Sequence, residues 1–174
     1  MKKIIIIGPA HPLRGGIAAF NERLANALLE EGHQVHIETF KLQYPNFLFP
    51  GKTQYSDSPE PDNLNIDVTI NSVNPFNWIK IGRKLKKMNA DLAIVAFWLP
   101  FMGPCLGKIC SIIKRNRKTK IVSLTHNLIP HEKRPGDGLF IRYFGKKADA
   151  FLAMSKSVLK DIETTFPSAK SSYS

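Results

Sequence analysis

The sequence predicts an α/β fold, in which a doubly wound, mostly parallel, Rossmann-like sheet carries helices on both faces. Short apolar runs typical of buried strands alternate along the chain with segments of helical periodicity. The first such unit is a strand, a glycine-containing loop, a helix and a second strand. With 174 residues, 43% of them apolar and 22% charged, the composition is that of one globular domain.

The first strand is predicted at residues 3–7, where four consecutive isoleucines suit a sheet covered on both faces. This run is too short for the apolar core of a signal peptide, which needs about 7–15 residues. A helix follows, with an apolar stripe of Ile17, Phe20, Leu24 and Leu28 and with Asn21 and Glu22 off that stripe. Gly32 is expected to end the helix.

A second strand at residues 35–37, ending near Glu38, completes a β-α-β unit with a right-handed crossover. Residues 40–65 lack periodicity and are rich in turn formers, which indicates a long functional loop. We expect a domain over residues 1–166 and a frayed polar tail over residues 167–174. The remaining elements are predicted as strand 66–70, helix 75–89, strand 92–97, helix 102–115, strand 120–124, helix 138–147, strand 150–153 and helix 156–165.

The loop between the first strand and its helix is the strongest candidate for a binding site. Gly15 and Gly16 let the backbone approach a ligand, and the helix start offers free N–H groups, which together favour a phosphate or pyrophosphate. A plain turn is the alternative, although one glycine would suffice for it. His11 and Arg14 are candidates for contacts with phosphate or, equally, solvated loop residues. The spacing fits neither a dinucleotide fingerprint nor a P-loop.

A second candidate lies after the strand at residues 120–124. His126 is polar where a core position would be apolar, and it is expected near the glycine loop because ligands bind at the carboxyl ends of parallel strands. A structural histidine is the alternative. Glu132 is a possible carboxylate near an acceptor hydroxyl or else an exposed loop residue. The two cysteines and five histidines lack the spacing of a metal site, a triad or a disulfide framework, so we expect no metal and buried structural thiols.

The net charge is +11, and nearly all of the excess lies in residues 80–120, where 11 basic residues face one acidic residue. A solvated helix face, an anionic membrane surface and nucleic acid are the three interpretations; the last ranks lowest, because no nucleic-acid module accompanies the charge. The longest uncharged run is shorter than the roughly 20 residues that span a bilayer. The candidate surface consists of Lys80, Arg83, Lys84, Lys87, Lys114 and Arg115.

Taken together, these motifs resemble the N-terminal, acceptor-side domain of a GT-B glycosyltransferase of family 4. The resemblance covers nearly the whole chain, and the order and intervals of the motifs carry it. The matching pieces are Gly8-Pro9 with Gly15-Gly16, the helix at residues 21–28 with Gly32 and Val35, the loop at residues 44–52, Thr125-His126-Asn127 with residues 130–132, and Ala148-Asp149 with Ser155.

This resemblance implies a retaining transferase that moves a sugar from a nucleotide-sugar donor to a glycan or lipid-linked acceptor. It implies donor diphosphate near Gly15, Gly16 and Arg14, and His126 in a catalytic position beside the donor sugar. The nucleotide sugar is a substrate, and no other cofactor is implied. A second, C-terminal domain would hold the nucleotide, so we expect no activity from this chain alone. The residues expected to line the acceptor cleft are His11, Asn127, Glu132 and Arg134.

Two other functions stay open. Glu38 lies where a ribose-binding acid of an NAD-type Rossmann oxidoreductase would sit, although the glycine spacing argues against that class. A non-enzymatic anion- or lipid-binding module is the other. We expect a cytoplasmic location, peripheral at the inner membrane face if the basic surface binds lipid.

Overall fold

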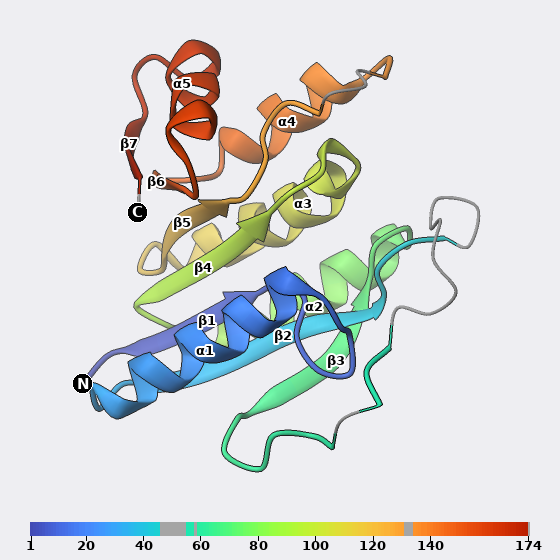
Figure 1. Cartoon of the computed structure of the whole chain (residues 1–174), viewed down its shortest axis with the longest axis vertical. Coiled ribbons are helices and arrows are strands. Elements are labelled where there is room, and N and C mark those ends of the chain that lie inside the picture. Colours follow the sequence, from blue (N-terminus) through green and yellow to red (C-terminus); the bar gives the residue numbers. More distant parts are fainter. Residues whose placement is uncertain (46–54, 58, 131–133, 174) are drawn as a thin grey trace.

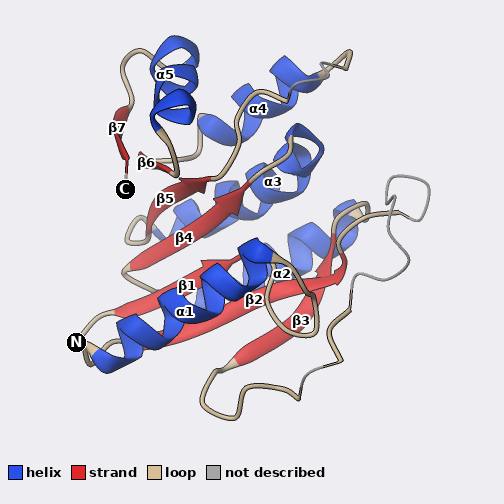
Figure 2. Ribbon diagram, viewed as in Figure 1, coloured by secondary structure: helices blue, strands red, loops and turns tan. Residues whose placement is uncertain are grey.

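The computed structural model describes residues 1–45, 55–57, 59–130 and 134–173. These residues form a seven-stranded parallel sheet in the order β3-β2-β1-β4-β5-β6-β7, with helices packed on both faces (Figures 1 and 2). This is the doubly wound, Rossmann-like arrangement predicted from the sequence. The order reverses between β1 and β4, so the sheet has its topological switch point there.

The first half of the sheet grows outward from β1, which pairs with β2, and β2 in turn pairs with β3. Helix α1 connects β1 to β2, and helix α2 carries the chain from β3 back across the sheet to β4. Asn74 caps α2 by accepting hydrogen bonds from the backbone N–H groups of Phe76 and Asn77. The elements are β1 (Lys3–Ile7), α1 (Gly16–Glu30), β2 (Gln34–Leu42), β3 (Ile66–Asn71) and α2 (Pro75–Met88).

The second half adds one strand after another on the opposite side of β1, through successive helical crossovers. Cys105 and Cys110 lie in α3 as buried free thiols, as expected, and burial raises the pKa of both. The elements are β4 (Leu92–Phe97), η2 (Pro100–Met102), α3 (Gly103–Ile113), η3 (Lys114–Asn116), β5 (Lys120–Thr125), α4 (Asp137–Gly145), β6 (Ala150–Ala153), α5 (Lys156–Thr165) and β7 (Lys170–Tyr173).

The core is unequal on the two faces of the sheet. A large apolar cluster joins one face to α2, α3, α4 and α5, whereas a small one joins the other face to α1 (Figure 1). The predicted stripe of α1 is only half-buried, and the residues that the helix buries are Ala18, Asn21 and Ala25. Asn21 was expected off the stripe; it is buried because its amide donates to the carbonyl oxygen of Pro9, 2.8 Å away.

Two predicted boundaries were wrong. Residues 170–173, expected to fray, form β7 and pair in parallel with β6. They carry no apolar signal because β7 is an edge strand whose side chains are mostly exposed. Strand β2 runs from Gln34 to Leu42, well beyond Glu38, because β1 and β3 flank it. Glu38 therefore sits inside the strand and not at its end.

Candidate functional site

The candidate site lies at the carboxyl ends of β1, β4 and β5, which meet at the switch point of the sheet. Gly8 follows β1, Trp98 follows β4 and His126 follows β5. The backbone N–H of His126 donates to the carbonyl oxygen of Phe97, at 2.9 Å, which fixes the start of the β5 loop beside the end of β4. Ligands of open α/β sheets bind in this position.

The loop from Gly8 to Gly15 is held to the sheet by several hydrogen bonds. The hydroxyl of Thr39 on β2 accepts from the backbone N–H of Ala10 at 2.9 Å, and Glu38 accepts from the N–H of Gly8 through its carbonyl at 3.2 Å. A Cβ on Gly8 would lie 2.7 Å from the Asn21 amide nitrogen, so Gly8 is required by packing. The loop therefore presents the start of α1 in a fixed position.

Of the two glycines at the start of α1, only Gly15 has a backbone conformation that requires glycine. Gly15 has φ +128°, which side-chain-bearing residues rarely adopt. Gly16 has no such φ, and a Cβ built on it meets none of the described neighbouring atoms within 4 Å. Neither strain nor packing explains a glycine at position 16. Among the described residues no side chain caps this helix, so its first N–H groups lack a capping partner.

A hollow of about 320 Å³ lies on one side of this helix start. It brings together three predicted residues, His11, Arg14 and Gly15, and two that sequence reasoning missed, Glu22 and Ser56. The Glu22 carboxylate accepts from the backbone N–H of His11 at 2.7 Å. Glu22 lies two turns into α1, and its part in the hollow depends on the folded course of the loop, so no local pattern marked it.

His126 lies on another side of α1, with its imidazole edge-on to Phe20 at 5.8 Å between ring centres. Phe20 is one helical turn beyond Gly16 and shares its face. The Nε2 atom of His126 is buried and has no hydrogen-bond partner among the described residues. Burial lowers the pKa of His126, so the ring is neutral near pH 7. A binding role predicts a buried ring nitrogen that is left without a protein partner. A structural histidine would have its ring nitrogens hydrogen-bonded within the protein.

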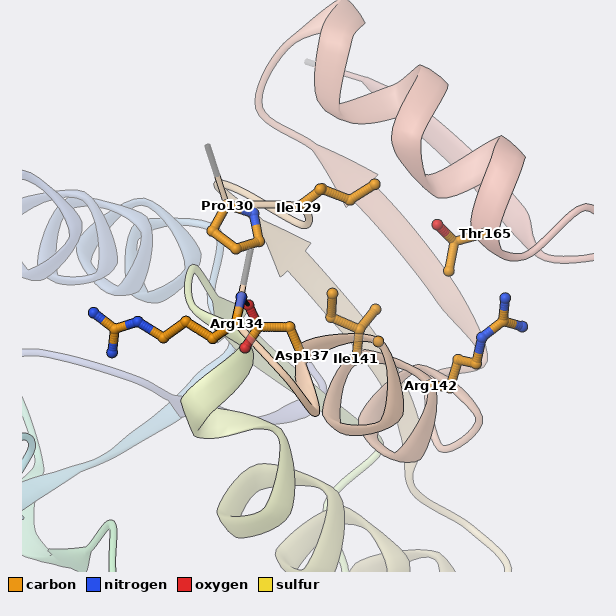
Figure 3. A pocket seen from close by; sticks show the side chains of 8 residues that line it. Ile129, Pro130, Arg134, Asp137, Ile141, Arg142 and Thr165 are labelled. Carbon is orange, nitrogen blue, oxygen red and sulfur yellow. Dashed lines mark hydrogen bonds between the residues drawn. The ribbon is translucent and has the colours of Figure 1, made fainter. Parts of the chain in front are cut away.

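The other predicted cleft residues do not all converge here. Asn127 follows His126 and is half-buried, whereas Glu132 lies outside the described residues, as do residues 46–54 and 58 of the long loop. Arg134 is exposed and lines a separate pocket of about 230 Å³ with Asp137, Ile141 and Arg142. In Figure 3 the Arg134 and Arg142 side chains point away from each other. His126 is not among the residues that line this pocket.

Trp98 is a residue at the switch point that sequence reasoning missed. Its ring packs edge-on against Phe40, 5.9 Å between centres, and its indole N–H donates to the Tyr44 hydroxyl. This contact connects the end of β4 to the start of the long loop after β2. The available signal was its position directly after a buried strand.

Two residues of the predicted basic surface are committed to ion pairs. The Lys84 ammonium lies 2.6 Å from carboxylate oxygens of both Glu38 and Asp67, and the Lys114 ammonium lies 2.8 Å from Asp149. Burial lowers the pKa of Lys84, but its hydrogen bonds to Asp67 and Glu38 outweigh burial and raise it. Their inclusion in a surface for external anions was therefore wrong, because carboxylates of the domain already neutralise them.

The environment of Glu38 rules out its expected role in binding a ribose. Its side chain is fully buried, with His36 at 2.9 Å and Lys84 at 2.6 Å. His36, Glu38 and Asp67 offer three donor atoms within 4.8 Å of one another, a spacing that could hold a metal ion. The positive charge facing both carboxylates in this structure is the Lys84 ammonium. This cluster stabilises the packing of α2 on the sheet.

The comparison with protein families decides the class of the chain. Residues 14–172 match the family described as Glycosyltransferase Family 4. The chain belongs to this family. The resemblance read from the glycine loop and from Thr125-His126-Asn127 is thereby confirmed. No curated protein matches this family 4 domain in sequence.

Solved structures support the same fold at low sequence identity. An alpha-glucosyltransferase in complex with UDP and a mismatched 13-mer DNA superposes with a TM-score of 0.62 at 14% identity, over 98% of this chain and 40% of that one. A UDP-GlcNAc 2-epimerase from Methanocaldococcus jannaschii gives 0.58 at 10% identity, over 93% and 42%. The family 4 domain thus spans about two fifths of these proteins.

A third structure is matched along most of its own length. A sucrose-phosphate synthase fragment from Thermosynechococcus elongatus gives a TM-score of 0.54 at 12% identity, over 99% of this chain and 87% of that one. At such identities these likenesses establish the Rossmann-like half of a GT-B fold. Within the described residues, no helix combines the length and apolar character needed to cross a bilayer.

Proposed function

We propose that this family 4 domain takes part in transfer of a sugar from a nucleotide-sugar donor, with the donor diphosphate at the start of α1. The observation that carries the proposal is Gly16, whose missing side chain is explained neither by φ nor by packing. The free N–H groups and the positive end of the α1 dipole favour an anion there. Arg14, exposed and beside Gly15 in the hollow, adds a positive charge.

In this proposal His126 faces the sugar. Its Nε2 is buried without a partner among the described residues, and its ring contacts Phe20, which lies one helical turn beyond Gly16 on α1. A neutral imidazole can form a hydrogen bond with a sugar hydroxyl or the transferred oxygen. Because the ring carries no charge, this contact avoids the cost of removing a charged group from water. This arrangement supports a retaining transfer in which most catalysis comes from stabilising charge on the departing diphosphate.

The acceptor side of the proposal rests on the hollow and on the residues around β5. His11 and Asn127 lie at the same carboxyl edge as His126 and offer polar groups for an acceptor hydroxyl. A hexose donor and a glycan or lipid-linked acceptor on the cytoplasmic face of the membrane are the substrates that we propose. A donor domain of the GT-B type would complete the nucleotide pocket.

The test is titration of this chain with uridine diphosphate, followed by amide chemical shifts. We expect weak binding that shifts the amides of Gly16, Ile17 and Ala18, and loss of those shifts in Gly16→Val. Gly138→Val is the matched control, because a Cβ on Gly138 in the first turn of α4 also meets no atom within 4 Å. Both variants should keep the melting temperature of the parent, within the small effect of a helix-start substitution. Unchanged binding by Gly16→Val would remove the diphosphate site.

A further inference from the structure

The outward face of α2 joins an exposed aromatic ring to a line of cations. Phe76, Lys80, Arg83 and Lys87 are spaced by four, three and four residues, so they lie on one side of the helix. Together with Ile79 and Lys84 they line a groove of about 550 Å³. We call the set Phe76, Ile79, Lys80, Arg83 and Lys87 the α2 patch.

The fold does not account for Phe76. Its side chain is 84% exposed in the first turn of α2, whereas the apolar side of the helix buries Ile81 and Leu85 in the core. One exposed apolar residue is ordinary by itself. The informative feature is that this ring stands at the end of a row of cations on the same helix face.

The charge of the α2 patch is not balanced locally. Lys80, Arg83 and Lys87 are exposed and have no acidic partner among the described residues, in contrast to Lys84. Helix α2 itself contains no acidic residue, and neither do its neighbours α3 and η3. A surface with cations along its length and an apolar ring at one end matches a bilayer whose headgroups are anionic and whose interior is apolar.

We propose that the α2 patch binds an anionic lipid bilayer, with Phe76 entering the acyl region and Lys80, Arg83 and Lys87 contacting the headgroups. This goes beyond sugar transfer, since neither the donor site nor His126 takes part. A nucleic-acid duplex would satisfy the cations equally, but its stacked bases leave no apolar surface for the phenylalanine at the end of the cationic row. The carboxyl edge of the sheet, where the candidate site lies, is at the same end of the domain as the start of α2 (Figure 1).

The test is co-sedimentation of the chain with vesicles of phosphatidylcholine, with and without phosphatidylglycerol. We expect binding only to the anionic vesicles, weakening as salt is raised because screening shortens the reach of the charges. Replacing Lys80, Arg83 and Lys87 together by Gln should weaken binding on the order of a hundredfold, about fivefold for each cation. Phe76→Ser should weaken it about tenfold with the charge unchanged.

The matched control replaces three exposed lysines elsewhere, Lys2, Lys160 and Lys170, by Gln, which changes the net charge equally. This control should still bind the vesicles within about threefold of the parent, since charges beyond a Debye length are screened. Equal loss in the two triple variants would show general attraction of a basic protein and overturn the proposal. Tighter binding to a DNA duplex than to anionic vesicles at the same salt would overturn it as well.

Insertion of Phe76 has its own readout. In Phe76→Trp, anionic vesicles should shift the tryptophan emission to the blue, and lipids brominated on the acyl chain should quench it. Leu139→Trp is the control, because Leu139 is similarly exposed in the first turn of α4. The parent protein gives the background from Trp78 and Trp98. Equal quenching at both new positions, or none at position 76, would refute insertion.

Discussion

Single residues in this domain acquire their roles from neighbours that are distant in the sequence. His126 is accessible to sequence reasoning as a polar residue after a strand. The structure adds its contact with Phe20 and a buried Nε2 that has no hydrogen-bond partner in the part of the chain that is described. Lys84 looks like one more lysine of a basic helix. Its ammonium instead joins two carboxylates, one of them fully buried, on β2 and β3. Residue type alone did not distinguish Lys84 from Lys80.

At this scale His126 predicts a pH dependence of stability. Burial holds the pKa of His126 below its ordinary value in the folded chain, so the unfolded chain binds a proton more readily. The free energy of unfolding should therefore decrease as pH falls below about 6.5 and level off once the folded ring is also protonated. Urea denaturation between about pH 7.5 and 5.5 should show a smaller decrease for His126→Gln than for the parent. Superimposable pH profiles would contradict this assignment.

At the scale of elements, apolar periodicity predicted the helices and strands that pack into the core. It missed the strand that is defined by backbone pairing alone. The bounds of β6 and α5 are confirmed, because both elements carry regular apolar residues that enter the core. Strand β7 was missed because an edge strand with exposed polar side chains has no apolar alternation. The polar residues of the hollow were found only in part, since Glu22 and Ser56 reach it from separate elements.

The cluster that anchors α2 gives a prediction for an element. Lys84→Met should destabilise the domain by roughly 2–4 kcal/mol, because it leaves the buried Glu38 carboxylate without its cation; the partial exposure of Lys84 sets the lower end of this range. Lys80→Met, one turn earlier on the exposed face, should change stability by less than about 0.5 kcal/mol. Thermal or urea denaturation measures both. Similar effects of the two substitutions would show that Lys84 is an ordinary surface cation with no role in stability.

At the scale of the whole molecule, the fold class could be predicted because strands and helices alternate in a regular order along the chain. The same alternation predicted parallel strands, whose shared carboxyl edge brings the glycine loop and His126 together; the strand order, and with it the switch point between β1 and β4, came from the structure. The division of the site into two sides of α1 could not be predicted, since it depends on how the loop at residues 8–15 folds against Thr39 and Asn21.

The coverage of the similar proteins predicts how this domain behaves alone. The chain spans about two fifths of the first matched structures, and our proposal assigns it only the half of the cleft at the start of α1. We expect the 174-residue chain to bind donor weakly and to release no nucleotide in a coupled transfer assay. As a positive control, the chain is mixed with a separately produced family 4 donor domain and the same assay is repeated. Multiple turnovers by the chain without that addition would contradict the prediction.

The position of β1 beside β4 has a consequence for the cooperativity of the domain. Lys3 and Asp91, which meet at the start of this pairing, are 88 residues apart, whereas every other pairing in the sheet joins two strands that are consecutive in the chain. Gly16 belongs to the first half of the chain and His126 to the second. A ligand held by both bridges the two halves of the sheet across this pairing, and its binding energy adds to the free energy of unfolding of the whole sheet.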